Sequence, residues 1–273
     1  MFEYNVLKFF ESLRNPILDK IFIFITNLGS FEFYLFSIAF LFFICNNRTS
    51  LKILFLLVIS FSINTLIKNI LKLPRPDEEV FNPIYKESSQ GYGFPSGHSQ
   101  NATSFWITIS KNFKKKSILI FSIIIIFLIS ISRLYLSLHF LLDVLGGILI
   151  GIFIVYLFFD LIDIFLDNLM KIKFNFIFFL SLLIFGVFSK NYSNLFIPLS
   201  GIIFGFLLKK EESKINLNFE KILIRELIGL SVLIILIYIS IQIKNFIFLT
   251  IIYFISGLWI SYLSKFLFSK INV

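Results

Sequence analysis

The stretch from 116 to 159 reads KSILIFSIIIIFLISISRLYLSLHFLLDVLGGILIGIFIVYLFF, and it decides the class of fold. It holds two apolar runs, 116–133 and 138–159, which are separated by a short turn. Each run is close to the ~20 residues that a helix needs to cross the hydrocarbon core of a bilayer. A helix also satisfies its own backbone hydrogen bonds there. The stretch therefore predicts two membrane-spanning helices that follow one another directly.

The rest of the chain has the same apolar character. Of its 273 residues, 58% are hydrophobic and 15% are charged, whereas soluble domains have about 45–50% apolar and about 25% charged residues. We therefore predict an all-α, polytopic transmembrane helical bundle that sits in a lipid bilayer. The net charge of +9 is attributed to short loops that set the topology, so nucleic acid is not an expected partner.

The predicted elements begin with an amphipathic helix at 4–14, expected at the membrane interface, and a half-buried segment at 17–28. The charged residues within 2–14 argue against a cleaved signal peptide. A core is expected at 1–160, with five spans, and a C-terminal membrane region of about four spans at 161–273. The nine spans, with eight as the alternative count, are 31–46, 51–72, 97–112, 116–133, 138–159, 174–189, 193–208, 223–243 and 246–268, with a charged link at 160–173.

Basic residues cluster in three loops that fall on the same side of the membrane if the spans alternate. Because cytoplasmic loops carry an excess of Lys and Arg, that side is predicted to be cytoplasmic. The N-terminus is then outside and the C-terminus inside, and the composition favours a bacterial inner membrane. The basic residues are Arg48 and Lys52, then Lys111, Lys114, Lys115 and Lys116, then Lys209, Lys210, Lys214, Lys221 and Arg225.

Lys68 lies near the end of the second predicted span, Arg75 follows that span, and Pro76 comes directly after Arg75. Two helical turns separate the two cations, so they share a face if the helix continues as far as Arg75. Pro74 argues against such a continuation, and in that case Arg75 reaches over the site from a loop. Taken alone, both are explained as interfacial cations whose stems lie along the membrane.

Pro95-Ser96-Gly97-His98 comes directly before an apolar run. Ser96 is expected to cap a helix, and Gly97 allows another backbone or a ligand to approach closely. The free N–H groups of a helix N-terminus bind anions, so this turn is a candidate phosphate site. The competing interpretation is an ordinary helix start with an incidental histidine.

His139 and Asp143 lie four residues apart at the start of the fifth predicted span, which places them on one helix face. An aspartate in that position can accept a hydrogen bond from one imidazole nitrogen and leave the other free to attack. Arg133 precedes them across the turn between the fourth and fifth spans. The competing interpretation is an interfacial group of polar residues with no chemistry.

Taken together, the three motifs supply a set of chemical groups that no single motif contains. All three are predicted on one membrane face, where they supply three cations, a helix N-terminus, two histidines and an aspartate. Phosphoryl transfer through a phosphohistidine needs such a set, because its catalysis is mostly positioning and charge stabilisation. No acidic cluster suits Mg²⁺, and histidines beside cations suit zinc poorly. We therefore expect no metal and no cofactor.

At these residues the chain resembles the type 2 phosphatidic acid phosphatase superfamily of membrane lipid phosphatases. The pattern of that family is Lys-x6-Arg-Pro, then Pro-Ser-Gly-His, then Ser-Arg-x5-His-x3-Asp. The segments 68–76, 95–98 and 132–143 match it without a substitution. The resemblance covers roughly 17–160 and implies a catalytic core there, while the last four predicted spans have no counterpart in it.

The resemblance also implies a role for each matching residue. His139 would be the nucleophile that forms the covalent intermediate, and Asp143 would orient it. His98 would protonate the leaving oxygen and then activate water. The phosphate oxygens would be held by Lys68, Arg75, Arg133, Ser96 and the Gly97 amide.

The substrates implied by the resemblance are lipid phosphates and isoprenyl diphosphates, such as phosphatidic acid, phosphatidylglycerol phosphate, sphingoid phosphates and undecaprenyl diphosphate. The expected activity is a metal-independent phosphatase at the extracytoplasmic face. One alternative is a phosphotransferase that passes the phosphoryl group to a lipid or sugar hydroxyl, and another is a sugar phosphatase similar to glucose-6-phosphatases. A third is a non-enzymatic lipid-binding or transport protein on the scaffold of a former enzyme.

Overall fold

The structure, a computed structural model, describes residues 2–45, 47–89, 91–169, 180–181, 183–184, 193–208, 218–243 and 245–271. Within these ranges the regular secondary structure is helical throughout, and no strand occurs. The chain divides into two compact units. The first comprises Met1–Phe36 and Lys52–Asp163, and the second comprises Ser37–Leu51 and Ile164–Val273. The boundaries between the units fall within three helices, between Phe36 and Ser37, between Leu51 and Lys52, and between Asp163 and Ile164.

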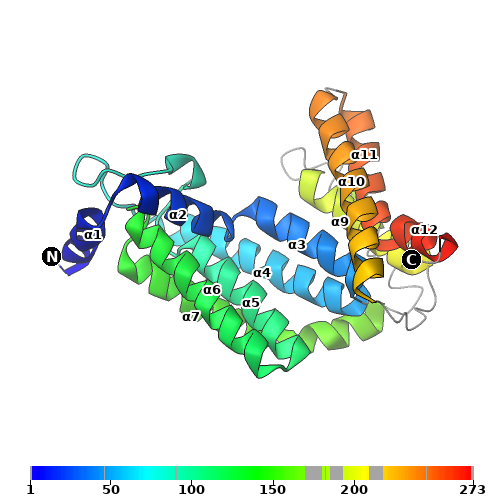
Figure 1. Cartoon of the computed structure of the whole chain (residues 1–273), viewed down its shortest axis with the longest axis horizontal. Coiled ribbons are helices and arrows are strands. Elements are labelled where there is room, and N and C mark those ends of the chain that lie inside the picture. Colours follow the sequence, from blue (N-terminus) through cyan, green and yellow to red (C-terminus); the bar gives the residue numbers. More distant parts are fainter. Residues whose placement is uncertain are drawn as a thin grey trace. The chain divides into compact units, whose positions relative to one another are not determined.

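The first unit is a helical bundle with its longest loop at one end. In Figure 1, α4, α5, α6 and α7 run alongside one another, and the loop before α5 lies at the same end as α1 and α2. Both α1 and α2 contact α6, and α5 packs against α6 over much of its length. The helices are α1 (Phe2–Ser12), α2 (Pro16–Asn27), the start of α3 (Phe31–Ile44), most of α4 (Asn47–Leu71), η1 (Lys86–Ser88), α5 (Gly97–Phe113), α6 (Lys116–Tyr135) and most of α7 (Leu141–Leu169).

Helix α1 is amphipathic, as the sequence predicts. Leu7 is fully buried and packs in a cluster with Phe81, Leu134 and Val144. On the other side, Phe2 is 70% exposed. A short helix with a buried face and an exposed aromatic face is suited to the boundary between headgroups and acyl chains.

Five described helices are long and apolar enough to cross a membrane, or six if one bent pair counts as a single span. The bent pair joins α2 to α3 at an angle of 51°. Five of the nine predicted spans coincide with these helices, three others correspond to shorter helices, and 174–189 lies almost wholly outside the described residues. The five helices are Arg48–Leu71, Lys116–Tyr135, Leu141–Asn168, Phe219–Gln242 and Phe246–Lys270.

Helix α5 accounts for one of the differences. Its bounds, Gly97–Phe113, agree closely with the predicted span at 97–112. However, it has only 17 residues and is not among the candidate spans, and most of its buried side chains are polar rather than apolar. Such a helix is stable in a bilayer only where neighbouring helices satisfy its polar groups. The buried residues are Ser99, Gln100, Asn101, Ala102, Thr103, Ser104, Phe105, Thr108 and Ser110.

The predicted charged link at 160–173 is wrong over its first part, because α7 continues as a helix to Leu169. Its carboxylates have basic partners in the first unit: Lys52 forms an ion pair with Asp163. Lys111 Nζ lies 3.9 Å from Asp160 and 4.1 Å from the ring centroid of Phe159. Paired charges can continue a helix where an unpaired aspartate would be expected to end it.

Close contact between α5 and α7 fixes the position of the N-terminal end of α7. A Cβ atom at Gly147 would lie 2.6 Å from the Ser96 carbonyl oxygen, and one at Gly151 would lie 2.7 Å from that of Gln100. Real Cβ contacts are not this short, so only glycine allows the two backbones to approach so closely. The glycines thereby place the start of α7 directly beside the start of α5.

The second unit has its own apolar cluster, made of Ala39, Phe43, Leu233 and Phe268. Trp259 Nε1 donates to the Gly229 carbonyl oxygen at 3.0 Å. Its described helices are the end of α3, α9 (Ser193–Leu208), α10 (Phe219–Gln242), α11 (Phe246–Leu258), the π-helical turn η3 (Trp259–Leu263) and α12 (Ser264–Lys270).

Candidate active site

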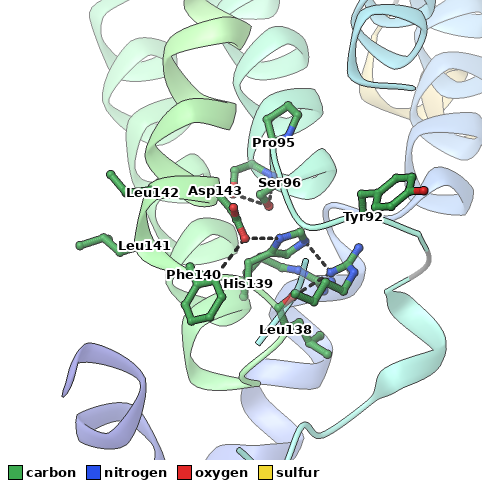
Figure 2. Close-up of polar contacts among 12 residues, drawn as sticks. Tyr92, Pro95, Ser96, Leu138, His139, Phe140, Leu141, Leu142 and Asp143 are labelled. Atoms are coloured by element: carbon green, nitrogen blue, oxygen red, sulfur yellow. Dashed lines mark hydrogen bonds and ion pairs between the residues drawn. The ribbon is translucent and has the colours of Figure 1, made fainter. Parts of the chain in front are cut away.

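The three sequence motifs meet at one end of the first unit. Lys68 lies in the last turn of α4, Pro95–His98 forms the start of α5, and Arg133 lies in the last turn of α6. His139 lies in the turn between α6 and α7. Figure 2 shows Asp143 between Ser96 and His139, with a polar contact to each residue.

Arg75 lies in a loop rather than on α4, because α4 ends at Leu71. Arg75 Nε donates to the Gly91 carbonyl oxygen at 2.8 Å. Its Nη1 lies 2.7 Å from the Leu138 carbonyl oxygen and 3.0 Å from His139 Nε2. Of the two possibilities that the sequence leaves open, the structure therefore supports an arginine that reaches over the site from the loop.

Lys68 remains on α4 and points toward the same loop. Its Nζ donates to the carbonyl oxygen of Tyr92. Lys68 and Arg75 thus approach the histidine turn from different backbone segments, held by two carbonyl oxygens that lie one residue apart in the loop. Both cations are held by backbone carbonyl oxygens, so these contacts do not depend on which side chains the loop carries.

The contacts of His139 define which nitrogen carries the proton. An arginine can only donate, so His139 Nε2 must accept from Arg75 and must carry a lone pair. The proton is then on Nδ1, which donates to Asp143 Oδ2 at 3.2 Å. The same carboxylate oxygen accepts from the backbone N–H of Phe140 at 3.0 Å. Asp143 therefore fixes the tautomer in which Nε2 is the nucleophilic nitrogen.

His139 is held in its neutral form by its surroundings. Burial lowers the pKa of His139 well below its ordinary value of 6.5, and the positive charges of Arg75, Arg133 and Lys68 lower it further. The side chain is 1% exposed. An imidazole that resists protonation keeps its lone pair at acidic pH, and a nitrogen nucleophile requires that lone pair.

We expect the pKa of His139 to be measurable by NMR, because the chain has only two histidines. With ¹³C-labelled histidine, the resonance lost in His139→Gln should titrate below 6.5, and Arg75→Gln should raise its pKa. Because the folded state binds this proton less readily than the unfolded state, stability is complete above pH 6.5 and falls as the pH drops below that value. A His139 resonance that titrates at or above 6.5 would contradict this expectation.

Ser96 is the N-cap of α5, as predicted. The Ser99 backbone N–H donates to Ser96 Oγ at 3.5 Å, and the Ser99 hydroxyl donates to the same oxygen at 3.1 Å. The Ser96 backbone N–H donates to the Asp143 carbonyl oxygen at 2.9 Å. The cap therefore ties the first turn of α5 to the helix that carries Asp143, while direct contact of Ser96 or Gly97 with a phosphate stays a prediction.

His98 packs against the turn between α2 and α3. A Cβ atom at Gly29 would lie 3.0 Å from His98 Cδ2, so glycine makes the space for the ring. His98 Nε2 is buried and has no hydrogen-bond partner among the described residues. A buried imidazole nitrogen without a partner is available to a substrate.

Arg133 is fully buried and is held by two segments that the motifs do not include. Its Nη1 donates to Thr26 Oγ1 at 2.7 Å and to Ser88 Oγ at 3.1 Å, and its Nη2 donates to the Ser88 carbonyl oxygen at 3.1 Å. Its Nε has no partner among the described residues. Thr26 and Ser88 thus fix one side of the guanidinium, and contact with a phosphate remains a prediction.

The N-terminal segment contributes two residues to the histidine turn that the sequence reasoning missed, namely Glu3 in α1 and Arg14 in the link between α1 and α2. Glu3 accepts from the backbone N–H groups of Leu141 and Leu142, at 2.7 and 3.1 Å, and so caps the start of α7. Arg14 donates to Ser137 Oγ at 2.7 Å and to the Tyr135 carbonyl oxygen at 3.1 Å. The turn that carries His139 is therefore braced on both sides by the N-terminal segment.

Comparison with known proteins gives a consistent result. The sequence pattern of the PAP2 superfamily matches residues 49–165. The chain is 34% identical over 160 residues to phosphatidylglycerophosphatase B of Bacillus subtilis, covering 53% of this chain and 75% of that protein. It is 29% identical over 151 residues to human sphingosine-1-phosphate phosphatase 2, covering 53% of this chain but only 38% of that relative.

A solved structure supports the same relation. The crystal structure of a transmembrane PAP2-type phosphatidylglycerolphosphate phosphatase from Bacillus subtilis superposes with a TM-score of 0.50 and 28% sequence identity. The match covers 61% of this chain and 85% of that protein. The similar part contains all three motifs, since these lie between Lys68 and Asp143.

Proposed function

Because this chain belongs to the PAP2 superfamily, we propose that it is a membrane phosphatase that hydrolyses a lipid phosphate or an isoprenyl diphosphate through a phosphohistidine at His139. The observation that carries the proposal is the geometry at His139. Asp143 holds the proton on Nδ1, and Nε2 presents its lone pair beside a guanidinium. This arrangement is suited to attack on a phosphorus atom whose oxygens bear negative charge.

In the first step, His139 Nε2 attacks phosphorus, and the bond between phosphorus and the ester oxygen of the lipid breaks. His98 gives a proton to that oxygen, and the lipid alcohol leaves. The positive charge that develops on the His139 ring is stabilised by Asp143, which accepts from Nδ1. Arg75, Lys68 and Arg133 are positioned to balance the charge of the phosphoryl oxygens.

In the second step, a water molecule attacks the phosphohistidine. His98, which is now neutral, takes a proton from the water, the bond between Nε2 and phosphorus breaks, and inorganic phosphate leaves. His98 is returned to its protonated form for the next turnover. No step requires a metal ion, so activity is expected to persist in EDTA.

The proposed substrate is a lipid that carries a terminal phosphate. Two similar proteins are named for activity on phosphatidylglycerophosphate and sphingosine 1-phosphate, which are both amphiphilic phosphate monoesters. Helix α1 supports this class, because its exposed aromatic face lies on the unit that contains the site. Isoprenyl diphosphates remain in the proposal because the motifs do not distinguish one phosphate from two.

We place the site at the extracytoplasmic face of a bacterial inner membrane, with the N-terminus outside. The support is the distribution of charge along the sequence. Lys111, Lys114, Lys115 and Lys116 surround the link between α5 and α6, which is at the opposite end of these helices from His98 and Arg133. By the positive-inside rule that link is cytoplasmic.

The test is phosphate release by the purified full chain in detergent micelles with EDTA. The panel contains phosphatidic acid, phosphatidylglycerol phosphate, undecaprenyl diphosphate and glucose 6-phosphate. We expect release from at least one lipid and little from glucose 6-phosphate. With a ³²P-labelled lipid, label should appear in inorganic phosphate. Label that appears in a second lipid or in a sugar would replace hydrolysis by phosphotransfer, and preference for glucose 6-phosphate would overturn the substrate class.

A further inference from the structure

A group of polar side chains lies inside the first unit, behind the start of α5. Ser60 and Asn64 come from α4, and Gln100, Asn101 and Ser104 come from α5. Each is at most 6% exposed, and three of the five are fully buried. Polar side chains inside a membrane bundle are costly unless they satisfy one another, so their arrangement calls for a specific role.

The group is connected by hydrogen bonds that join the two helices. Gln100 Nε2 donates to the Ser60 carbonyl oxygen at 2.8 Å, and Gln100 Oε1 accepts from Asn64 Nδ2 at 2.9 Å. Ser60 Oγ and Asn101 Oδ1 are 2.7 Å apart, and Ser104 Oγ lies 3.1 Å from Ser60 Oγ. Gln100 therefore uses both ends of its amide on α4, so a shift of one helix along the other would break both bonds.

Asn64 also reaches the motif turn itself. Its Nδ2 lies 3.3 Å from the Pro95 carbonyl oxygen, and a Cβ atom at Gly97 would lie 3.2 Å from its Oδ1. Along α4, Asn64 is one turn before Lys68, so the two side chains share a face. Asn64 thus connects the cation on α4 with the turn on α5 whose N–H groups would face a phosphate.

We propose that Asn64 and Gln100 are positioning residues for the phosphate site. Their hydrogen bonds set the register of α4 against α5, and this register fixes the distance between Lys68 and the Pro95–His98 turn. They act through Lys68 and the backbone of that turn, and they do not touch the substrate. The inference rests on the proposed function in one respect, namely that the turn and Lys68 bind the same phosphate group.

Stability alone does not account for this arrangement. Replacing both partners of a buried hydrogen bond by apolar groups of similar shape is often nearly neutral for stability, whereas removing one partner leaves the other unsatisfied and is costly. An apolar pair at positions 64 and 100 could therefore hold the two helices together. It would not define their register, because apolar contacts tolerate sliding where the amide pair does not.

The experiment separates the two effects, the stability of the helix pair and the register of α4 against α5. Asn64→Leu, Gln100→Leu and the double variant are compared with the wild type, with Thr65→Ala as a matched control. Thr65 is the exposed neighbour of Asn64, and its hydroxyl bonds only within α4, to the Phe61 carbonyl oxygen at 2.9 Å. Two quantities are measured on the full chain in detergent: the thermal midpoint of unfolding, and the dissociation constant for inorganic phosphate or orthovanadate by calorimetry.

We expect each single variant to lose both thermal stability and anion affinity. The double variant should recover most of the thermal stability but still bind the anion about 10- to 100-fold more weakly than the wild type, as displaced site groups imply. Thr65→Ala should match the wild type in both. A double variant that recovers stability and binds the anion within about twofold of the wild type would overturn the proposal.

The binding assay also separates this proposal from the proposed function. A wild-type protein that binds phosphate but releases none from any lipid contradicts the function, while the comparison of variants still tests positioning. If the double variant does not fold, Asn64→Ser decides the matter, because it keeps a small polar group at the site but loses the Pro95 and Gln100 contacts. Unchanged anion affinity in Asn64→Ser would overturn the proposal, and weakened affinity with a near-normal midpoint would support it.

Discussion

Replacing His139 by alanine is expected to lower kcat for lipid phosphate release by about 10⁴-fold or more, because the covalent route is removed entirely. The residual rate would come from the cations and the start of α5, which can still bind and polarise a phosphate. The measurement is a kinetic comparison of the variant and the wild type on the best lipid of the panel. Thermal unfolding of both proteins shows whether the variant is intact.

One further variant, His98→Ala, refines this prediction. His98→Ala should still form the phosphohistidine from a substrate whose leaving group needs no proton, such as an aryl phosphate, but should hydrolyse it slowly. A ³²P-labelled enzyme that is stable in alkali and labile in acid should therefore accumulate in His98→Ala and be absent in His139→Ala. Label that is retained in His139→Ala would show that another residue is the nucleophile.

Gly147→Ala is expected to have the next largest effect, because its Cβ would lie 2.6 Å from the Ser96 carbonyl oxygen. The clash is with backbone, so α7 must move away from α5. We expect a loss of about 1–3 kcal/mol in the free energy of unfolding, together with a fall in kcat of about 10- to 100-fold as His139 and Asp143 shift relative to His98.

The matched control for Gly147→Ala is Leu149→Ala, two residues further along α7. Leu149 is 66% exposed, so its truncation changes the outer surface of the helix and leaves the contact with α5 intact. Denaturant titration and steady-state kinetics on both variants decide the outcome. If Gly147→Ala retained wild-type kcat, the close contact of α5 with α7 would not be what sets the geometry of the site.

The helices of the catalytic region were predictable where the sequence carries local signals. Ser96 marks the start of α5 because a serine before an apolar run satisfies the first free N–H groups. The apolar run at 116–133 gives nearly the full extent of α6 because few other arrangements suit it. By contrast, the end of α7 could not be predicted, because it depends on the ion pair of Asp163 with Lys52, over a hundred residues earlier.

Three of the nine predicted spans correspond to helices that are shorter than a usual span. Hydropathy treats every apolar run as a span, but whether a helix crosses the bilayer also depends on its length and on what surrounds it. Helix α9 has 16 residues and α3 has 14, and both are shorter than the ~20 residues that a straight span requires. Helix α5 has the length of a short span, yet it carries many buried polar residues, and some of these bond to α4, as Gln100 and Ser104 do.

The side chains of the candidate site could be predicted from the sequence, whereas the groups that hold them in place could not. The spacing of His139 and Asp143 gave their contact, although His139 lies just before α7 rather than within it. The carbonyl oxygens of Gly91 and Tyr92, which hold the two cations, leave no trace in the sequence, because every residue has one. The support of Arg133 by Thr26 was equally inaccessible, since it joins positions 107 residues apart.

The bracing of the histidine turn by α1 has a consequence for biosynthesis. Glu3 caps α7 across 138 residues of intervening chain. At ribosomal rates of about 5–20 residues per second, Glu3 is made roughly 7 to 30 s before the backbone groups that it will bind. During that interval α1 has neither its cap partners on α7 nor its partners on the turn after α6. The catalytic end therefore cannot be complete before the start of α7 has been synthesised.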